Sequence, residues 1–454
     1  MNTKSACFNP TSRKAYQGKL ILTKNHSAET DIWQTRMNNN VLVLGCSGSG
    51  KTRNHLKPNL LQCNGSYIVL DTKGSLYEEM GAYLALQGYR VDQLDFTTMG
   101  GTCGYDPLHQ VRIEDGMPNQ QDMIAIASAV CPKEEQKSDP FWGLAAANYL
   151  TSYIAYVFEA LPEQEWSMAS VIKLFEKGQG KLVHLFGDLE TRNPESYAAA
   201  LYNRAKATCG AEKMHSSILG IIAANLLPFG FKGALEAYAN PNRADFASFG
   251  REKRALFVTV DDMDHSLDGL TSLFVQQAFT HLCSSADHDY PEKRLSVPVR
   301  FILDDFANLH LPHIDDVLSV IRSREISCTI ICQTVSQLEA RYGMAEANSI
   351  IGNCDRQMVL AVQDEATARY FSTRANKPAT YLLETPANKW WLFERGKRGV
   401  LDDAYQLEMH PEYPFLQAIC ERKYQLNDDN QFELAFDKEL FDEIERETRD
   451  YFAA

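Results

Sequence analysis

The chain lacks the regular cysteine spacing of a disulfide framework or a structural zinc site. Its 454 residues include 11 cysteines, an odd number, and no two of them form a C-x-x-C pair. Small secreted scaffolds and zinc modules depend on such regular pairs. The cysteine pattern therefore favours a reducing compartment, and we expect Cys328 and Cys332 to be core residues.

Long apolar runs are also scarce. The first 19 residues, MNTKSACFNPTSRKAYQGK, contain no hydrophobic segment of the kind found in secretory signals. The best candidate for a membrane span is residues 144–161, but Glu159 and several other polar residues interrupt it. Because a spanning helix needs about 20 predominantly apolar residues, we expect a packed helix here. The sequence predicts no transmembrane segment and a cytoplasmic protein.

Positive charge is in deficit. The chain has 45 Lys and Arg residues against 59 Asp and Glu residues, a net charge of -14. Such a chain cannot coat nucleic acid with a uniformly basic surface, so any DNA contact would have to be local. Residues 421–454 hold 11 acidic and 5 basic residues, a net charge of -6. This acidic C-terminal tail is either a partner-docking element or an exposed amphipathic helix over residues 438–452.

The sequence contains one complete motif for phosphate binding. Four apolar residues, 41–44, lead into GCSGSGKT at residues 45–52, which fills the phosphate-loop pattern G-x-x-x-x-G-K-[ST] at every defined position. Its glycines let the backbone turn N–H groups inward at the start of a helix, where a polyphosphate binds. Lys51 would reach the β- and γ-phosphates of a bound nucleotide, and Thr52 would ligate Mg²⁺. The expected nucleotide-binding residues are Gly45, Cys46, Ser47, Gly48, Ser49, Gly50, Lys51 and Thr52.

Apolar runs that alternate with helical segments predict an α/β fold with a parallel-rich central sheet and right-handed crossovers. The expected strands are residues 19–23, 41–44, 66–70, 89–94, 255–260, 297–303, 326–332 and, as the last, 357–362. Between residues 116 and 249 alanine-rich helical segments replace the strands. The predicted domains are an N-terminal entry region at 1–40, a nucleotide-binding domain at 41–115 and 250–420, an all-helical insertion at 116–249, and the tail at 421–454.

Two acidic residues follow the apolar strand at 297–303. Asp304 would hold the metal, directly or through water, and Asp305 or a neighbouring residue would polarise the attacking water. Gln333, after the next strand, is either a sensor of the γ-phosphate or an ordinary polar residue at a strand end. Arg322 and Arg324 could act on the nucleotide of a neighbouring subunit, or could be surface charges.

A tryptophan pair near the C-terminus permits two interpretations. Trp390 and Trp391 are followed by Arg395, Lys397 and Arg398. Aromatic faces beside basic groups are typical of single-stranded DNA sites. Aromatic residues are also typical of a strand that packs on the core.

Longer motifs resemble those of the type IV secretion coupling proteins of conjugative DNA transfer, over about residues 18–362. They are GCSGSGKT at 45–52, DTKG at 71–74, YDPL at 105–108, DPFW at 139–142, LDDFANL at 303–309, IRSREIS at 321–327, QTVSQL at 333–338 and IGNCD at 351–355. The resemblance implies a RecA-like motor domain, an inserted all-helical domain and homo-hexameric rings. It also implies ATP-driven delivery of relaxase-bound single-stranded DNA, with accessory proteins, to a type IV secretion channel. Two alternatives stay open, a receptor that binds ATP and recruits protein cargo without pumping DNA, and a DNA translocase of the chromosome-segregation type.

Two departures from the family pattern carry expectations of their own. The family usually has glutamate where this chain has Asp305, so the sequence predicts normal ATP binding but slow hydrolysis. Glutamate at position 305 would speed hydrolysis if the site has not compensated for the shorter aspartate. It would slow hydrolysis if the backbone has moved inward to compensate. The family also commonly has two N-terminal membrane helices, and this chain has none. The expected alternatives are recruitment to the inner face of the cell membrane through a separate membrane subunit, or assembly from the cytoplasm.

Overall fold

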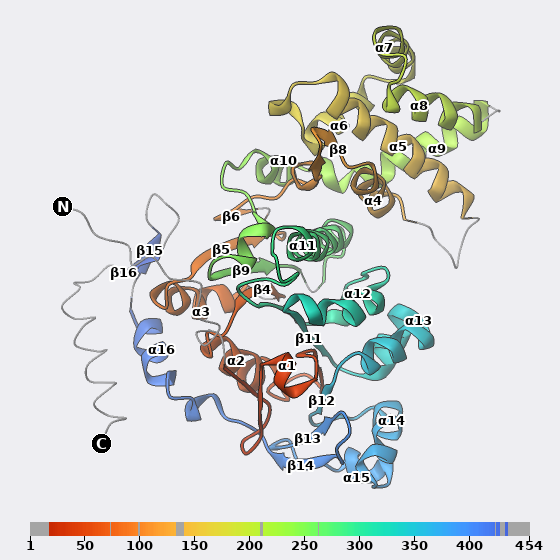
Figure 1. Ribbon diagram of the computed structural model, residues 1–454. Coiled ribbons are helices and arrows are strands. Elements are labelled where there is room, and N and C mark those ends of the chain that lie inside the picture. The colour runs from red at the N-terminus through yellow and green to blue at the C-terminus, as the bar shows by residue number, and fades with distance from the viewer. Residues whose placement is uncertain are drawn as a thin grey trace, which may run out of the picture. The chain divides into compact units, whose positions relative to one another are not determined.

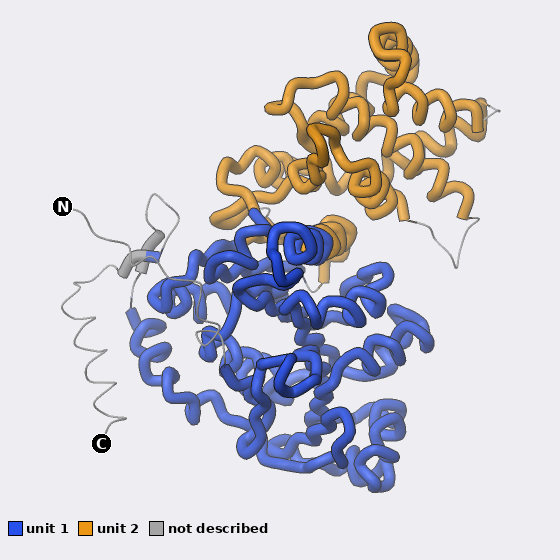
Figure 2. The backbone as a smooth tube through the Cα atoms, viewed as in Figure 1, with its two compact units in different colours: residues 1–93, 245–262, 279–454 blue, residues 94–244, 263–278 orange. Residues whose placement is uncertain are grey.

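The computed structural model describes residues 18–72, 74–98, 100–132, 140–208, 212–261, 263–422, 424–426 and 432–434. The chain forms two compact units (Figure 2). Unit 1 comprises residues 1–93, 245–262 and 279–454, and unit 2 comprises residues 94–244 and 263–278.

A ten-stranded sheet has the strand order β14-β13-β12-β3-β11-β10-β4-β9-β5-β6. The strands β12, β3, β11, β10, β4 and β9 run parallel to one another, whereas β13 pairs antiparallel with β12 and β14, and β6 pairs antiparallel with β5. The bounds are β3 Val41–Leu44, β4 Ser66–Asp71, β5 Arg90–Asp95, β6 Gly100–Gly101, β9 Arg254–Thr259, β10 Val299–Leu303, β11 Ile326–Cys332, β12 Arg356–Val359, β13 Lys389–Glu394 and β14 Val400–Asp403. The central strands are almost wholly buried and mostly apolar because helices cover both faces of a parallel sheet.

Right-handed crossovers distribute the helices of unit 1 over the sheet (Figure 1). The chain moves from β3 to β4 to β5 in one direction, which places α2 and α3 on one face. It then moves back from β10 to β11 to β12, which places α12 and α13 on the other. The bounds are η2 Lys51–Leu56, α2 Lys57–Leu61, α3 Ser75–Leu86, α12 Ile314–Val320, η8 Ile321–Arg324, α13 Val335–Gly352, α14 Glu365–Ala375, α15 Ala379–Leu383 and α16 Tyr413–Cys420. Helix α11 Asp268–His288 begins in residues of unit 2 and ends in residues of unit 1.

The sheet extends beyond the strand that the sequence predicts as its last. Strand β12 ends at Val359, and β13 and β14 continue the sheet next to it. Trp390 is 0% and Trp391 3% exposed, and the Trp391 indole N–H donates to the Thr385 hydroxyl at 3.1 Å. Because bases cannot stack on buried rings, the single-stranded DNA interpretation of this tryptophan pair is wrong, and the packed-strand interpretation is confirmed.

Unit 2 is mainly helical. Its helices are α4 Gln120–Val130, α5 Phe141–Ala160, α6 Met168–Glu176, α7 Gln179–Arg192, α8 Tyr197–Thr208, α9 Glu212–Leu226 and α10 Lys232–Ala239. Helix α5, the candidate span, is buried along most of its length by the other helices of the unit. None of the helices in the described part of the chain combines the length and the hydropathy needed to cross a bilayer.

The limits of unit 2 differ from the range 116–249 predicted for a helical insertion. The unit begins at residue 94, takes in residues 263–278, and includes the short hairpin β7 Ile113–Glu114 and β8 Met117–Pro118. Two hydrogen bonds show why. The Tyr105 hydroxyl donates to Gln277 Oε1 at 2.6 Å, and Gln277 Nε2 donates to the Pro107 carbonyl at 3.0 Å. Such contacts join segments that lie far apart in the sequence.

The acidic tail is described only in part. Strands β15 Tyr424–Leu426 and β16 Phe432–Leu434 form a two-stranded hairpin, and the Phe432 ring lies 5.2 Å from that of Tyr77 on α3. The helix expected at residues 438–452 lies outside the described residues.

One carboxylate on β14 collects several hydrogen bonds from the N-terminal region. Strands β1 Lys19–Ile21 and β2 Ser27–Glu29 precede α1 Ile32–Thr35. Asp402 on β14 accepts hydrogen bonds from Thr23 Oγ1 at 2.7 Å, Asn25 Nδ2 at 2.8 Å and His26 Nδ1 at 3.0 Å. Partial burial opposes the charged form, but these donors outweigh it and hold the pKa of Asp402 well below its usual value.

Replacing this carboxylate is expected to destabilise unit 1. Asp402→Ala leaves several donors without their acceptor, so the free energy of unfolding at pH 7 should fall by about 1–3 kcal/mol in urea titrations. Since the folded-state pKa is depressed, the contribution is present above the unfolded pKa of about 3.9 and disappears as the pH falls below it. Asp403→Ala is the control, because it removes only a half-exposed pair with Lys389. Equal losses in the two variants would contradict the assignment.

Candidate nucleotide-binding site

The phosphate loop follows β3 and is held from both sides. The backbone N–H of Gly45 donates to the carbonyl of Cys332 at 3.3 Å, and that of Cys46 donates to the carbonyl of Ala361 at 3.1 Å. A Cβ atom at Gly45 would lie 2.6 Å from Ser49 Oγ and 2.8 Å from a side-chain atom of Leu360. Only glycine fits at this position.

The loop turns through two glycines in the left-handed region. Gly48 has φ 78° and Gly50 has φ 89°. Lys51 then opens η2, a π-helical turn, and its Nζ donates to the carbonyl oxygens of Gly45 at 2.7 Å and Cys46 at 3.1 Å. The ammonium group therefore lies across the loop. Such π-helical turns are frequent at functional sites.

One buried hydroxyl inside the loop has no partner. Ser49 Oγ is buried and makes no hydrogen bond within the described part of the protein. A buried polar atom without a partner is unfavourable, so it marks a place where a ligand can complete the hydrogen bonding. Together with the Lys51 ammonium and the turned backbone, it fits a phosphate group.

Thr52 and Asp304 meet although 251 residues separate them in the chain. Thr52 Oγ1 donates to Asp304 Oδ2 at 3.2 Å. Burial, and then the negative charge of Asp305, raise the pKa of Asp304. A hydroxyl and a carboxylate are the hard oxygen ligands that Mg²⁺ prefers, so this pair fits the predicted metal position.

Asp305 occupies an unusual backbone conformation. Its φ is 47° and its ψ 42°, in the left-handed region that aspartate and asparagine enter more readily than longer side chains. Its N–H donates to Asp304 Oδ1 at 3.1 Å, and Thr72 Oγ1 lies 3.5 Å from its Oδ2. Thr72 belongs to the DTKG segment that follows β4, a motif to which the sequence assigned no chemical role.

Gln333 lies at the same edge of the sheet as the phosphate loop. It directly follows Cys332, whose carbonyl accepts from the loop, and its side chain is half-buried.

Arg322 and Arg324 lie at the opposite edge. They precede β11, whereas the phosphate loop follows the parallel strand β3. Arg324 donates to both carboxylate oxygens of Asp287, at 2.9 and 2.7 Å, and Arg322 Nη2 donates to the Ile32 carbonyl at 3.1 Å. The structure does not bring either arginine to this chain's own phosphate loop.

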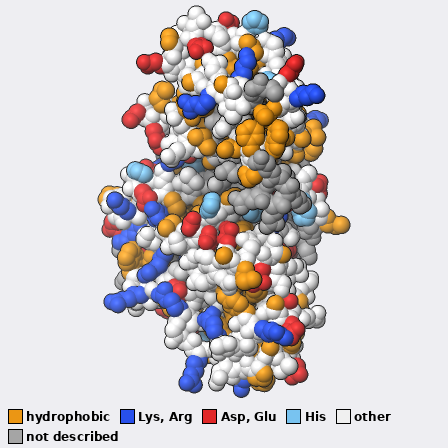
Figure 3. Space-filling model, turned by 90° about the vertical axis from the view of Figure 1, so that its right-hand side faces the viewer, with side chains coloured by type: hydrophobic (Ala, Val, Ile, Leu, Met, Phe, Trp, Pro, Cys, Tyr) orange, Lys and Arg blue, Asp and Glu red, His pale blue; other side chains and the backbone are white. Residues whose placement is uncertain are grey.

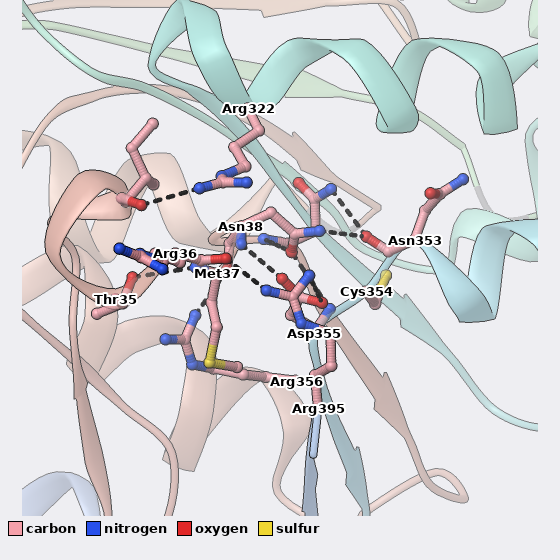
Figure 4. Close-up of polar contacts among 12 residues, drawn as sticks. Thr35, Arg36, Met37, Asn38, Arg322, Asn353, Cys354, Asp355, Arg356 and Arg395 are labelled. Carbon is pink, nitrogen blue, oxygen red and sulfur yellow. Dashed lines mark hydrogen bonds and ion pairs between the residues drawn. The ribbon is translucent and has the colours of Figure 1, made fainter.

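The IGNCD segment meets the entry region at this second edge (Figure 4). The carboxylate of Asp355 accepts from the Asn38 backbone N–H at 2.6 Å and pairs with Arg395 at 3.1 Å. Arg395 also donates to the Arg36 carbonyl. Asp355 of the IGNCD motif and Arg322 of the IRSREIS motif therefore both bind the segment that leads into β3.

Comparisons with known proteins follow this geometry. Residues 4–378 match the family model described as type IV secretory system conjugative DNA transfer. Protein VirD4 of Rhizobium radiobacter is 23% identical over 344 residues, which cover 73% of this chain and 47% of that protein. Protein VirD4 of Agrobacterium fabrum is 23% identical over 343 residues, with 73% and 48% coverage. The chain thus spans about half the length of the curated relatives it matches.

Solved structures show the same fold. The bacterial conjugative coupling protein TrwB without its first 70 residues, in its unbound form, aligns with a TM-score of 0.62 at 18% identity, over 80% of this chain and 85% of that one. VirB4 of Thermoanaerobacter pseudethanolicus aligns with a TM-score of 0.55 at 14% identity, over 85% and 95%. The expected α/β fold, a RecA-like P-loop domain with a helical domain, is confirmed. Because the family model covers well over half of the sequence, this chain belongs to the type IV secretion family of conjugative DNA-transfer proteins.

Proposed function

We propose that this chain is the ATP-driven motor of a coupling protein that delivers relaxase-bound single-stranded DNA to a type IV secretion channel. The observation that carries the proposal is the hydrogen bond from Thr52 to Asp304, which brings the two acidic residues after β10 to the phosphate loop that contains Lys51. TrwB structures in complex with a non-hydrolysable ATP analogue, and with ADP and Mg²⁺, support ATP and Mg²⁺ as the ligands. Active assembly as a homo-hexamer, accessory proteins and a separate membrane subunit at the inner face of the membrane belong to the same proposal.

Each residue then has a role that its position allows. Lys51 would exchange the carbonyl oxygens of its own loop for phosphate oxygens, and Thr52 and Asp304 would hold Mg²⁺. When bound, Mg²⁺ supplies positive charge that offsets the negative charge of the phosphates. Asp305 orients and polarises the water that attacks the γ-phosphate. Gln333, at the same edge, would sense whether the γ-phosphate is present.

DNA contact has to be local in this proposal. On the face shown in Figure 3, Lys and Arg side chains lie among Asp and Glu side chains and do not form one basic surface. Phosphate contacts from a few basic groups would still make binding strongly dependent on salt.

The test is ATP hydrolysis with and without single-stranded DNA. We expect Mg²⁺-dependent hydrolysis that single-stranded DNA accelerates and that rising salt returns to the basal rate. Binding of ATP with a rate that DNA leaves unchanged would favour the receptor that recruits protein cargo. Equal acceleration by double-stranded DNA would favour the chromosome-segregation type of translocase.

A further inference from the structure

The loops on both sides of the phosphate loop are joined to each other. Strands β11 and β12 flank β3 in the sheet. After β11 the chain passes through Gln333 and Thr334 into α13, and after β12 it passes through residues 360–364 into α14. The first turns of α13 and α14 therefore lie at the nucleotide edge of the sheet, on either side of the phosphate loop.

Three polar side chains make the junction. The Val335 N–H donates to Thr367 Oγ1 at 2.9 Å, and this hydroxyl donates to Asp364 Oδ2 at 2.7 Å. Ser336 Oγ lies 3.1 Å from both carboxylate oxygens of Asp364. Thr367 is 0% exposed, so its hydroxyl links the two helices in a site shielded from solvent. The first two residues of α13 are thereby attached to the first turn of α14.

The same two loops also contact the phosphate loop. Cys332 and Ala361 each accept a backbone hydrogen bond from it. Gln333 therefore stands between two attachments, because Cys332 precedes it and Val335 follows two residues later. Its backbone position depends on both contacts, and displacement of a reacting group by about 1 Å can reduce a rate roughly a hundredfold.

We propose that Thr367, together with Asp364 and Ser336, positions Gln333 at the γ-phosphate. The proposal rests on the proposed ATP hydrolysis and on the sensing role of Gln333. All three are positioning residues, because none of them touches the nucleotide. Asp364 also accepts from the Thr367 N–H at 2.9 Å as the N-terminal cap of α14. Burial opposes its charge, but the donors from Thr367 and Ser336 lower the pKa of Asp364, so it remains a carboxylate acceptor.

Thr367→Val is the main variant, since it keeps the side-chain shape and removes the relay. We expect kcat for ATP to fall by about tenfold to a hundredfold. The Kd for a non-hydrolysable ATP analogue should change by less than about threefold, because no phosphate ligand is removed. Thr367→Ser retains the hydroxyl and should restore the wild-type kcat. An unchanged kcat in Thr367→Val, at whatever melting temperature, would overturn the proposal.

A double-mutant cycle separates positioning from simple helix capping. If Thr367 acts through Gln333, Thr367→Val should add less than about a threefold loss to that of Gln333→Ala. If the fold losses in kcat of the two single variants multiply in the double variant, the proposal is overturned. Wild-type activity of Gln333→Ala would also overturn it. Should Thr367→Val fail to fold, Ser336→Ala gives the same cycle from a half-buried position. Failure of the proposed function is distinguishable, because hydrolysis would then persist in Lys51→Ala.

Discussion

Lys51→Ala is expected to reduce ATP hydrolysis by at least about a hundredfold, because it removes the ammonium group that would compensate charge on the β- and γ-phosphates. The fold should survive. Within the described part of the chain, Lys51 Nζ donates hydrogen bonds to two backbone carbonyls of its own loop, and Lys51 is not among the buried core residues. Phosphate release by purified protein measures the effect, and the melting temperature checks the fold.

Arg53→Ala is the matched control for this experiment. Arg53 lies two residues further along η2, carries the same charge, and pairs with Glu408 at an exposed position. Its removal should leave hydrolysis within about twofold of wild type. If Lys51→Ala keeps wild-type turnover, the assignment of this loop to ATP is wrong.

Asp305→Asn is expected to lower kcat by about a hundredfold while leaving ATP affinity unchanged. The amide keeps the shape of the side chain and removes the charge that polarises water. Asparagine enters the left-handed region as readily as aspartate, so the backbone at φ 47° should not change. Asp316→Asn, which removes a carboxylate that is 82% exposed, is the control and should leave kcat unchanged. Full activity of Asp305→Asn would show that another group polarises the water.

The backbone conformation of Asp305 also helps decide whether glutamate at this position would speed or slow hydrolysis. Glutamate is one methylene, about 1.5 Å, longer and has no comparable local hydrogen bonding in the left-handed region. It would also have to displace the Thr72 hydroxyl that lies 3.5 Å from the present carboxylate. We therefore expect Asp305→Glu to be slower than wild type in single-turnover hydrolysis. A faster Asp305→Glu protein would mean that the site has not compensated for the shorter residue.

The long motifs were readable without a structure because each is continuous in the chain. The glycines of G-x-x-x-x-G-K-T determine the backbone geometry of the loop. An apolar run that ends in Asp304 predicts that this residue lies at the carboxyl end of a strand, where ligands bind in such sheets. The packed helix α5 was also predictable from a continuous stretch of sequence. Polar residues within its apolar run argue against a membrane span, whatever the run packs against.

Tertiary structure decided which segments meet. The burial of Trp390 and Trp391 depends on β13 joining β12, and composition is the same whether that strand packs or stays exposed. The limits of unit 2 depend on Tyr105 and Gln277, which lie 172 residues apart.

Which residues lie near the phosphate loop also depends on which strands pair, and the sequence alone did not establish those pairs. Arg322 and Arg324 stand at the start of β11 and the phosphate loop stands at the end of β3, so parallel pairing separates them. The same pairing places Thr52 beside Asp304 and Val335 beside Thr367. Local sequence determined the loop and its ligand class because backbone conformation is a local property. The partners of each side chain follow from strand order, which only the long-range packing of the whole sheet sets.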